Sequence, residues 1–172
     1  YDFNRNGTAD YSFDGAHLTG QETTALTSVR GSATGTRKQT VDAAGNATGT
    51  WLTSVIFYGA YDRVIQTLSN NHLYATLADK TTIIYNFAGQ VVKSKTTHTS
   101  SATFSVSYVD RPVYDHAGRV RKQYRNIDNS TNDQLVAEYL YNKLGQVVDK
   151  KLHYSSGAYL QSVDYRYNIR GW

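Results

Sequence analysis

Polar and apolar residues alternate along much of the second half of the chain. In residues 162–167 the side chains of Val163, Tyr165 and Tyr167 occupy every second position, which would place them on one face of a β-strand. Patterns of this kind predict strands at residues 50–57, 64–68, 81–85, 91–95, 103–109, 119–125, 135–141, 147–154 and 159–167. Residues 135–140 have fair helix propensity, but their position directly before a turn motif favours a strand.

A turn motif that begins with tyrosine separates these strands. Its copies start at Tyr58, Tyr85, Tyr114, Tyr141 and Tyr167, so the steps between them are 27, 29, 27 and 26 residues. The clearest copy reads Tyr-Asp-His-Ala-Gly-Arg-Val over residues 114–120, and the last copy ends with the chain. A period in this range indicates an array of supersecondary units.

The second and fifth positions of the motif explain its shape. Asp or Asn at the second position, as in Asp115, favours a type I turn because its side chain accepts hydrogen bonds from backbone N–H groups ahead of it. Glycine at the fifth position favours φ > 0, so the motif predicts a type I turn with a bulge at Gly89, Gly118 and Gly145. In the first copy Asp62 also tolerates this conformation, whereas Gly59 at the second position predicts a looser turn.

We expect the motif tyrosines to be structural. Each closes a strand, and a valine opens the returning strand two positions after the glycine in Tyr85, Tyr114 and Tyr141 copies alike. If the units stack in phase, the rings should pack on these valines and on the next unit, and the hydroxyls should reach backbone partners or water.

These residues resemble the YD-repeat (Rhs) family, whose signature is Tyr-Asp, two variable residues, Gly, Arg and an apolar residue. The copy at Tyr114 matches every defined position, and the other complete copies match at the tyrosine, at the glycine or its substitute, and at the valine. The resemblance covers about residues 50–172. Residues 160–172 also resemble a segment of Rhs-type proteins from Bacteroidetes.

The resemblance implies an all-β fold: an antiparallel, twisted and curved sheet of hairpins, belonging to a spiral strip that forms a hollow shell. It implies a non-catalytic structural role without a cofactor, in a shell that encloses a C-terminal toxin or effector domain. The partners would be the rest of the same polypeptide and the enclosed domain, outside or on the surface of a bacterium. The family's proteolytic motif is missing here, so no catalytic residue is carried over.

The first fifty residues match the repeats weakly. They predict an N-terminal Thr- and Gly-rich hairpin region at residues 1–50, distinct from the array at 51–172. Residues 41–46 repeat the turn pattern only 17 residues before Tyr58, which predicts a hairpin out of phase with the array.

Four residues near the N-terminus have the alternate spacing of a calcium-binding loop: Asp2, Asn4, Asn6 and Asp10. The position that should carry a bidentate glutamate is Phe13, and Asp14 comes one residue late. The sequence therefore favours an Asn- and Gly-rich hairpin turn over a calcium site.

Charge and composition limit the kinds of partner that the chain is expected to bind. The net charge is +4, with a pI near 9.2, but the basic residues are scattered among acidic ones. Solvated sheet faces are therefore favoured over a nucleic-acid interface, which needs clustered positive charge. No apolar run approaches the roughly 18 residues of a membrane span, and no signal peptide is recognisable. The chain begins and stops inside turn motifs, which predicts a fragment of a longer protein.

The sequence offers little chemistry. The five histidines, at positions 17, 72, 98, 116 and 153, lack metal-ligand spacing, cysteine is absent, and no Gly-x-Ser-x-Gly motif occurs. An enzyme is therefore not expected. The alternative to a structural role is a carbohydrate- or cell-surface-binding β module, in which exposed aromatic rings stack on sugars. Rings buried against neighbouring units would favour structure, and rings lining an open groove would favour binding.

Overall fold

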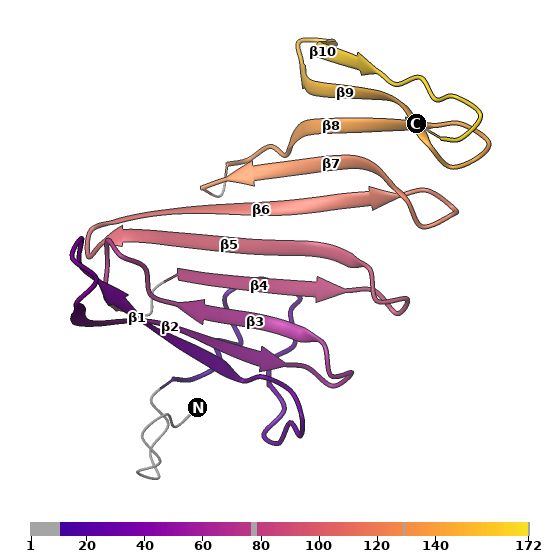
Figure 1. The fold of residues 1–172 in the computed structure, drawn as a ribbon. Coiled ribbons are helices and arrows are strands. Elements are labelled where there is room, and N and C mark those ends of the chain that lie inside the picture. Colours follow the sequence, from indigo (N-terminus) through magenta and orange to yellow (C-terminus); the bar gives the residue numbers. More distant parts are fainter. Residues whose placement is uncertain (1–10, 77–78, 129, 172) are drawn as a thin grey trace. The chain divides into compact units, whose positions relative to one another are not determined.

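The computed structural model describes residues 11–76, 79–128 and 130–171, which contain β-strands and no helix (Figure 1). The strands are β1 (Gly35–Val41), β2 (Ala47–Tyr58), β3 (Val64–Ser69), β4 (Asp79–Tyr85), β5 (Val91–Ser101), β6 (Phe104–Tyr114), β7 (Val120–Ile127), β8 (Gln134–Tyr141), β9 (Val147–Ser155) and β10 (Ala158–Asp164). They form an antiparallel sheet in which each strand pairs with the next in sequence. The all-β, twisted-sheet prediction is confirmed, and the spiral course of a longer strip stays a prediction.

The strands differ from the predicted ones mainly in length. β5 and β6 extend beyond residues 91–95 and 103–109, because a tight turn at residues 102–103 joins them directly. β10 stops at Asp164 instead of continuing to Tyr167. The N–H of Tyr165 still donates to the carbonyl of Val148 at 2.9 Å, and the chain then leaves the ladder for its last turn.

The hairpin predicted at residues 41–46 is present, and it joins β1 to β2. The N–H of Asp42 donates to the carbonyl of Asn46 at 2.9 Å, and Gly45 has a φ of 84°. β1 itself was not predicted, because its sequence, Gly-Thr-Arg-Lys-Gln-Thr-Val, has few apolar residues from which to read alternation.

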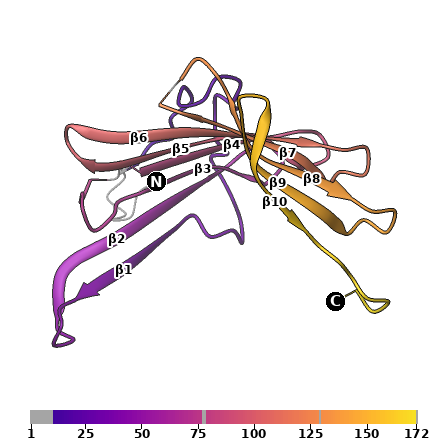
Figure 2. The same cartoon turned by 90° about the horizontal axis from the view of Figure 1, so that it is seen from above.

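The chain packs as two compact units, which are described separately. Unit 1 comprises Tyr1–Ile84 and Ser94–Ser107, and unit 2 comprises Tyr85–Lys93 and Tyr108–Trp172. Viewed from above, the strands within each unit are rotated stepwise, which is the twist of an antiparallel sheet (Figure 2).

In unit 1, residues 11–34 cross one face of the sheet as irregular loops, visible in indigo behind β3 and β4 in Figure 1. Gln66 in β3 is fully buried and holds this segment at Asp14. Its Oε1 accepts from the N–H of Asp14 at 2.8 Å, and its Nε2 donates to the carbonyl of Asp14 at 3.0 Å and to Thr82 Oγ1 at 2.9 Å. Lys80 adds an ion pair with the Asp14 carboxylate.

Beneath this segment lies the apolar core of unit 1. Val55, Leu68 and Leu18 are buried, and Val55 and Leu68 are paired across β2 and β3. The rings of Phe13 and Phe57 lie 5.7 Å apart between their centroids. The covering loops thus give this face the second layer that a sheet requires to bury apolar side chains.

His17 is the titratable group of this layer whose pKa is most displaced. Its ring nitrogens lie 2.7 Å from Thr82 Oγ1 and 3.0 Å from Thr97 Oγ1. Burial disfavours the charged ring, as do Lys80 and Lys95, and together they lower its pKa from 6.5 to about 4, against a smaller opposite effect of Asp14. The native state therefore holds His17 neutral.

We predict that the melting temperature of the chain falls as the pH is lowered from 6.5 to 4. In this window the unfolded state binds a proton at His17 that the folded state does not, so stability present above pH 6.5 is lost towards pH 4. His17→Gln keeps an amide that can bond both threonines but cannot titrate. Its melting temperature should depend less on pH over this window, and an identical pH profile for both proteins would contradict the prediction.

Unit 2 has a sparser interior. Of its described residues, Ala137 is the one buried apolar side chain, and most others on both faces are half-buried. Its motif turns, at residues 86–89, 115–118, 142–145 and 168–171, follow alternate strands. In an antiparallel sheet, turns that follow alternate strands lie at the same end of the strands. The motif turns of unit 2 therefore form one row.

Candidate functional site

The motif turns share one backbone geometry. In the clearest copy, the N–H of Gly118 donates to the carbonyl of Asp115 at 3.0 Å, and the N–H of Asp115 donates to the carbonyl of Arg119 at 2.9 Å. The same two bonds occur in the turns that start at Asn86 and Asn142. The strand register shifts beside the motif tyrosine in three of the hairpins, at Tyr58, Tyr114 and Tyr141. The predicted type I turn with a bulge is confirmed.

The turn glycines adopt the conformation that the motif predicts. Gly89, Gly118 and Gly145 have φ values of 84°, 77° and 83°. Asp62 takes the same place in the first copy, with a φ of 53°. The side chain of Asp115 accepts from the N–H groups of Ala117 and Arg119, both at 2.9 Å, which fixes the turn from inside.

The motif tyrosines connect one repeat to the one before it. The hydroxyl of Tyr114 donates to the carbonyl of Val91 at 2.8 Å, that of Tyr141 to Val120 at 2.6 Å, and that of Tyr167 to Val147 at 2.7 Å. In each case the acceptor is the valine that ends the preceding motif. In unit 1, Tyr58 reaches the carbonyl of Ala33 in the same way, at 2.8 Å.

The tyrosine also faces the valine of its own motif. The registers pair Tyr114 with Val120 and Tyr141 with Val147 across their hairpins. The prediction that the hydroxyls reach backbone partners is thus confirmed for these two copies, with the partners in the preceding motif. The packing of the rings on the valines and on the next unit stays a prediction. Each tyrosine is thus bonded through its hydroxyl to the preceding motif and lies opposite the valine of its own hairpin.

A feature that the sequence analysis missed is a pairing between the second and sixth positions of the motif. Asp115 bonds Arg119, with Nε 2.8 Å from Oδ2. The other two complete copies of unit 2 replace this ion pair by an amide pair at the same distance: Asn86 with Gln90 and Asn142 with Gln146. The signal was visible in the sequence, because in the three complete copies of unit 2 Asp occurs with Arg and Asn with Gln.

The sixth position also reaches the next turn. Gln90 Nε2 donates to the carbonyl of Gly118 at 2.9 Å, and the Arg119 guanidinium lies 4.4 Å from the centre of the Tyr141 ring. The hydrogen bond from Arg119 is the main cause that lowers the pKa of Asp115, with backbone N–H groups adding to it. Burial is the main cause that raises the pKa of Tyr141.

The turn at Gly59 keeps the backbone bonds of the others although it was expected to be looser. Its missing second-position side chain is replaced by Glu22 from the covering loops, whose Oε2 accepts from the N–H of Ala60 at 3.0 Å. A Cβ atom at position 59 would lie 2.3 Å from Glu22 Oε1, so glycine leaves the room that this carboxylate occupies.

The pairing of the second and sixth positions predicts that the effects of substitutions at Asp115 and Arg119 on stability are coupled. Asp115→Asn or Arg119→Gln alone should lower the melting temperature, because each removes one charge of the ion pair and leaves a weaker bond between an amide and a charged group. Asp115→Asn/Arg119→Gln recreates the amide pair of the neighbouring turns and should recover part of the loss, the stacking of Arg119 on Tyr141 remaining absent. Thermal melting of the four proteins measures this coupling, and strictly additive losses would contradict it.

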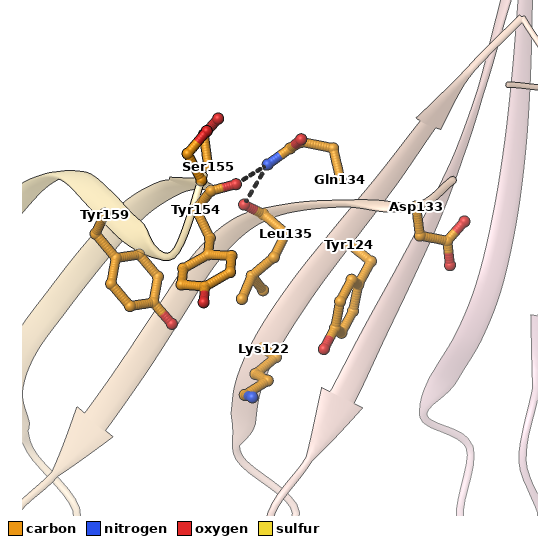
Figure 3. Close-up of a pocket in the computed structure, with 9 residues that line it drawn as sticks. Lys122, Tyr124, Asp133, Gln134, Leu135, Tyr154, Ser155 and Tyr159 are labelled. Carbon is orange, nitrogen blue, oxygen red and sulfur yellow. Dashed lines mark hydrogen bonds between the residues drawn. The ribbon is translucent and has the colours of Figure 1, made fainter. Parts of the chain in front are cut away.

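A second candidate site is a pocket on one face of unit 2, where β7, β8, β9 and β10 lie side by side (Figure 3). Its volume is about 600 Å³. It is lined by Lys122, Tyr124, Asp133, Gln134, Leu135, Tyr154, Ser155, Ser156 and Tyr159. Figure 3 shows the rings of Tyr159, Tyr154 and Tyr124 in a row with Leu135 between the last two.

The aromatic residues of the pocket are fixed in place. Tyr154 and Tyr159 are cross-strand partners whose rings meet edge to face, with centroids 5.0 Å apart. The Tyr159 hydroxyl bonds the Glu138 carboxylate, which raises the pKa of Tyr159 to about 12. The guanidinium of Arg111 lies 4.4 Å from the centre of the Tyr124 ring. Gln134 Nε2 ties β8 to β9 through the carbonyl of Tyr154.

The charged residues of the pocket are matched. Arg111 bonds Asp133, with Nη2 2.8 Å from Oδ2, and Lys122 Nζ lies 3.7 Å from Glu138 Oε1. Arg121 also approaches Glu138 Oε1, at 4.0 Å. The pocket therefore presents aromatic surface and polar groups, and each of its two charged lining residues has a partner of opposite charge.

The other candidate residues do not assemble into a site. The calcium-loop residues Asp2, Asn4, Asn6 and Asp10 lie outside the described residues. In the part of the chain that the structure describes, no three His, Cys, Asp or Glu side chains gather to hold a metal ion. Over the same residues the structure contains no helix long and apolar enough to cross a membrane.

No protein-family model matches the chain, and no curated protein matches its sequence.

Proposed function

We propose that this chain is a non-catalytic structural segment of a YD-repeat (Rhs) protein, in which its hairpins form part of a β-shell around a C-terminal toxin or effector domain. The observation that supports this most is the bond from three motif tyrosines, Tyr114, Tyr141 and Tyr167, to the valine of the preceding motif. Such a bond joins neighbouring repeats of the array, and it leaves the hydroxyl bonded within the protein instead of available to a ligand.

Some positions of the motif make contacts within the protein and others are exposed, and this difference agrees with a structural role. The first, second, fifth and sixth positions make the contacts described above. The third and fourth positions point into solvent, and Phe87 and Leu144 are 97% and 84% exposed there. A module that used the motif tyrosines to bind sugars would instead expose their rings and hydroxyls.

The proposal places the protein outside or on the surface of a bacterium, with the rest of the same polypeptide and the enclosed domain as its partners. The test is made on the complete polypeptide from the parent gene. We expect further Tyr-Asp repeats and then a domain without repeats, and we expect that domain to resist limited proteolysis.

A matched variant makes the proteolysis informative. Substituting valine for both Gly118 and Gly145 should disturb the β-shell and expose the downstream domain to the protease. The double variant Ala117→Val/Leu144→Val changes exposed positions of the same turns and should leave the domain protected. A gene without a downstream domain, or a domain cut equally in all three proteins, would refute the proposal.

A further inference from the structure

We propose that the tyrosine pocket of unit 2 binds a neutral saccharide, with Tyr154 as the ring on which the sugar packs. The lining includes three tyrosines, none of which is a motif tyrosine: Tyr124, Tyr154 and Tyr159. This site is therefore separate from the bonds that support the structural role, and each can fail without the other.

The size and composition of the pocket fit a small sugar. Sites for small molecules commonly measure about 300–1,000 Å³ and combine aromatic walls with a few polar groups. This pocket, at about 600 Å³, has three tyrosines and the polar side chains of Lys122, Asp133 and two serines. A sugar ring has an apolar face of C–H groups and a rim of hydroxyls, and it needs both kinds of wall.

The aromatic wall is formed before any ligand arrives. Tyr154 is 41% exposed, while Tyr159 is held by Glu138 and by its cross-strand pairing with Tyr154. A ring with its orientation already fixed loses little conformational entropy when a ligand packs on it. Aromatic side chains offer such an apolar surface together with a polar hydroxyl.

The polar side chains of the pocket, which form its polar wall, can both donate hydrogen bonds to sugar hydroxyls and accept hydrogen bonds from them. The ammonium of Lys122 can donate to a sugar oxygen, and the carboxylate of Asp133 can accept from a sugar hydroxyl. The hydroxyls of Ser155 and Ser156, at the hairpin turn between β9 and β10, can do either.

The charge balance selects the class of saccharide. Asp133 is paired with Arg111, and Lys122 shares Glu138 with Arg121, so each charged lining residue already has a partner within the protein. A neutral saccharide can bond the polar wall without breaking either ion pair, which favours a neutral ligand over a charged one.

The test starts with a glycan array probed with the chain itself, followed by titration of the best neutral glycan by NMR with ¹⁵N-labelled protein. We expect amide shifts confined to the pocket, around Gln134 and Ser155. Tyr154→Ala should weaken binding by about fivefold or more, because stacking on one ring contributes on the order of 1 kcal/mol. Tyr154→Phe keeps the ring and should bind like the parent.

Two further variants serve as controls. Tyr61→Ala removes a 73% exposed tyrosine of unit 1 and should leave binding unchanged. Ser155→Trp fills the rim of the pocket from an exposed position and should abolish binding even if Tyr154→Ala does not fold. The proposal is refuted if no neutral glycan on the array is bound, or if Ser155→Trp and Tyr61→Ala bind it equally.

Discussion

Replacing Tyr114 by alanine is expected to destabilise the chain by about 2–3 kcal/mol. Removal of a fully buried aromatic ring costs roughly 3–5 kcal/mol, and the Tyr114 ring is half-buried. The substitution also leaves the carbonyl of Val91 without the hydroxyl that it accepts from at 2.8 Å. Denaturant unfolding, with its linear extrapolation to water, measures this loss.

Tyr61→Ala is the matched control for this experiment. Tyr61 lies at a variable, exposed position of the Gly59 turn, so its removal should change the free energy of unfolding by less than about 0.5 kcal/mol. Equal stability of Tyr114→Ala and the parent would show that the motif tyrosine does not hold the repeats together.

Gly118→Val is expected to cost about 1–3 kcal/mol. The residue has a φ of 77°, where a β-branched side chain is strained. The new Cβ would also lie 2.9 Å from Gln90 Nε2, so that amide must move and give up its bond to the carbonyl of Gly118. One substitution thus disturbs two neighbouring turns.

Two substitutions separate backbone strain from general damage to the turn. Gly118→Asn should cost less than Gly118→Val, because asparagine tolerates the left-handed region. Ala117→Val adds the same side chain one residue earlier, at an exposed position, and should stay within about 0.5 kcal/mol of the parent. If the three variants melt together, the positive φ of Gly118 is not what stabilises the turn.

Local chemistry made most of the fold predictable. Each complete motif turn of unit 2 is determined by residues within seven positions: a second-position acceptor such as Asp115, a glycine that tolerates positive φ, and a valine that restarts the strand. Because successive strands pair through these turns, correct turns gave nearly correct strands.

The covering loops of unit 1 could not be predicted in this way. They carry no periodic pattern, and their position depends on contacts between distant residues. Asp14 meets Gln66 across 52 positions, and His17 meets Thr97 across 80. Nothing in the sequence around one partner indicates the other. The role of Glu22 at the Gly59 turn could not be predicted for the same reason.

The tyrosine pocket was hidden by an irregularity of the sheet. The register between β7 and β8 shifts between Gln123 and Tyr124, so that Leu135 and Glu138 pair with Tyr124 and Lys122 although they are three positions apart. Strict alternation would place Leu135 and Glu138 on opposite faces. The bulge that brings the pocket residues together therefore interrupts the pattern from which a face is read.

The hydroxyls of three motif tyrosines, Tyr114, Tyr141 and Tyr167, join their repeats to the preceding ones. The most direct test is the urea unfolding of Tyr114→Phe and Tyr141→Phe, which remove only the hydroxyls, beside Tyr61→Phe as the control. We predict that each motif variant loses about 0.5–1.5 kcal/mol, the contribution of one hydrogen bond, while Tyr61→Phe matches the parent. Motif variants as stable as Tyr61→Phe would contradict the claim.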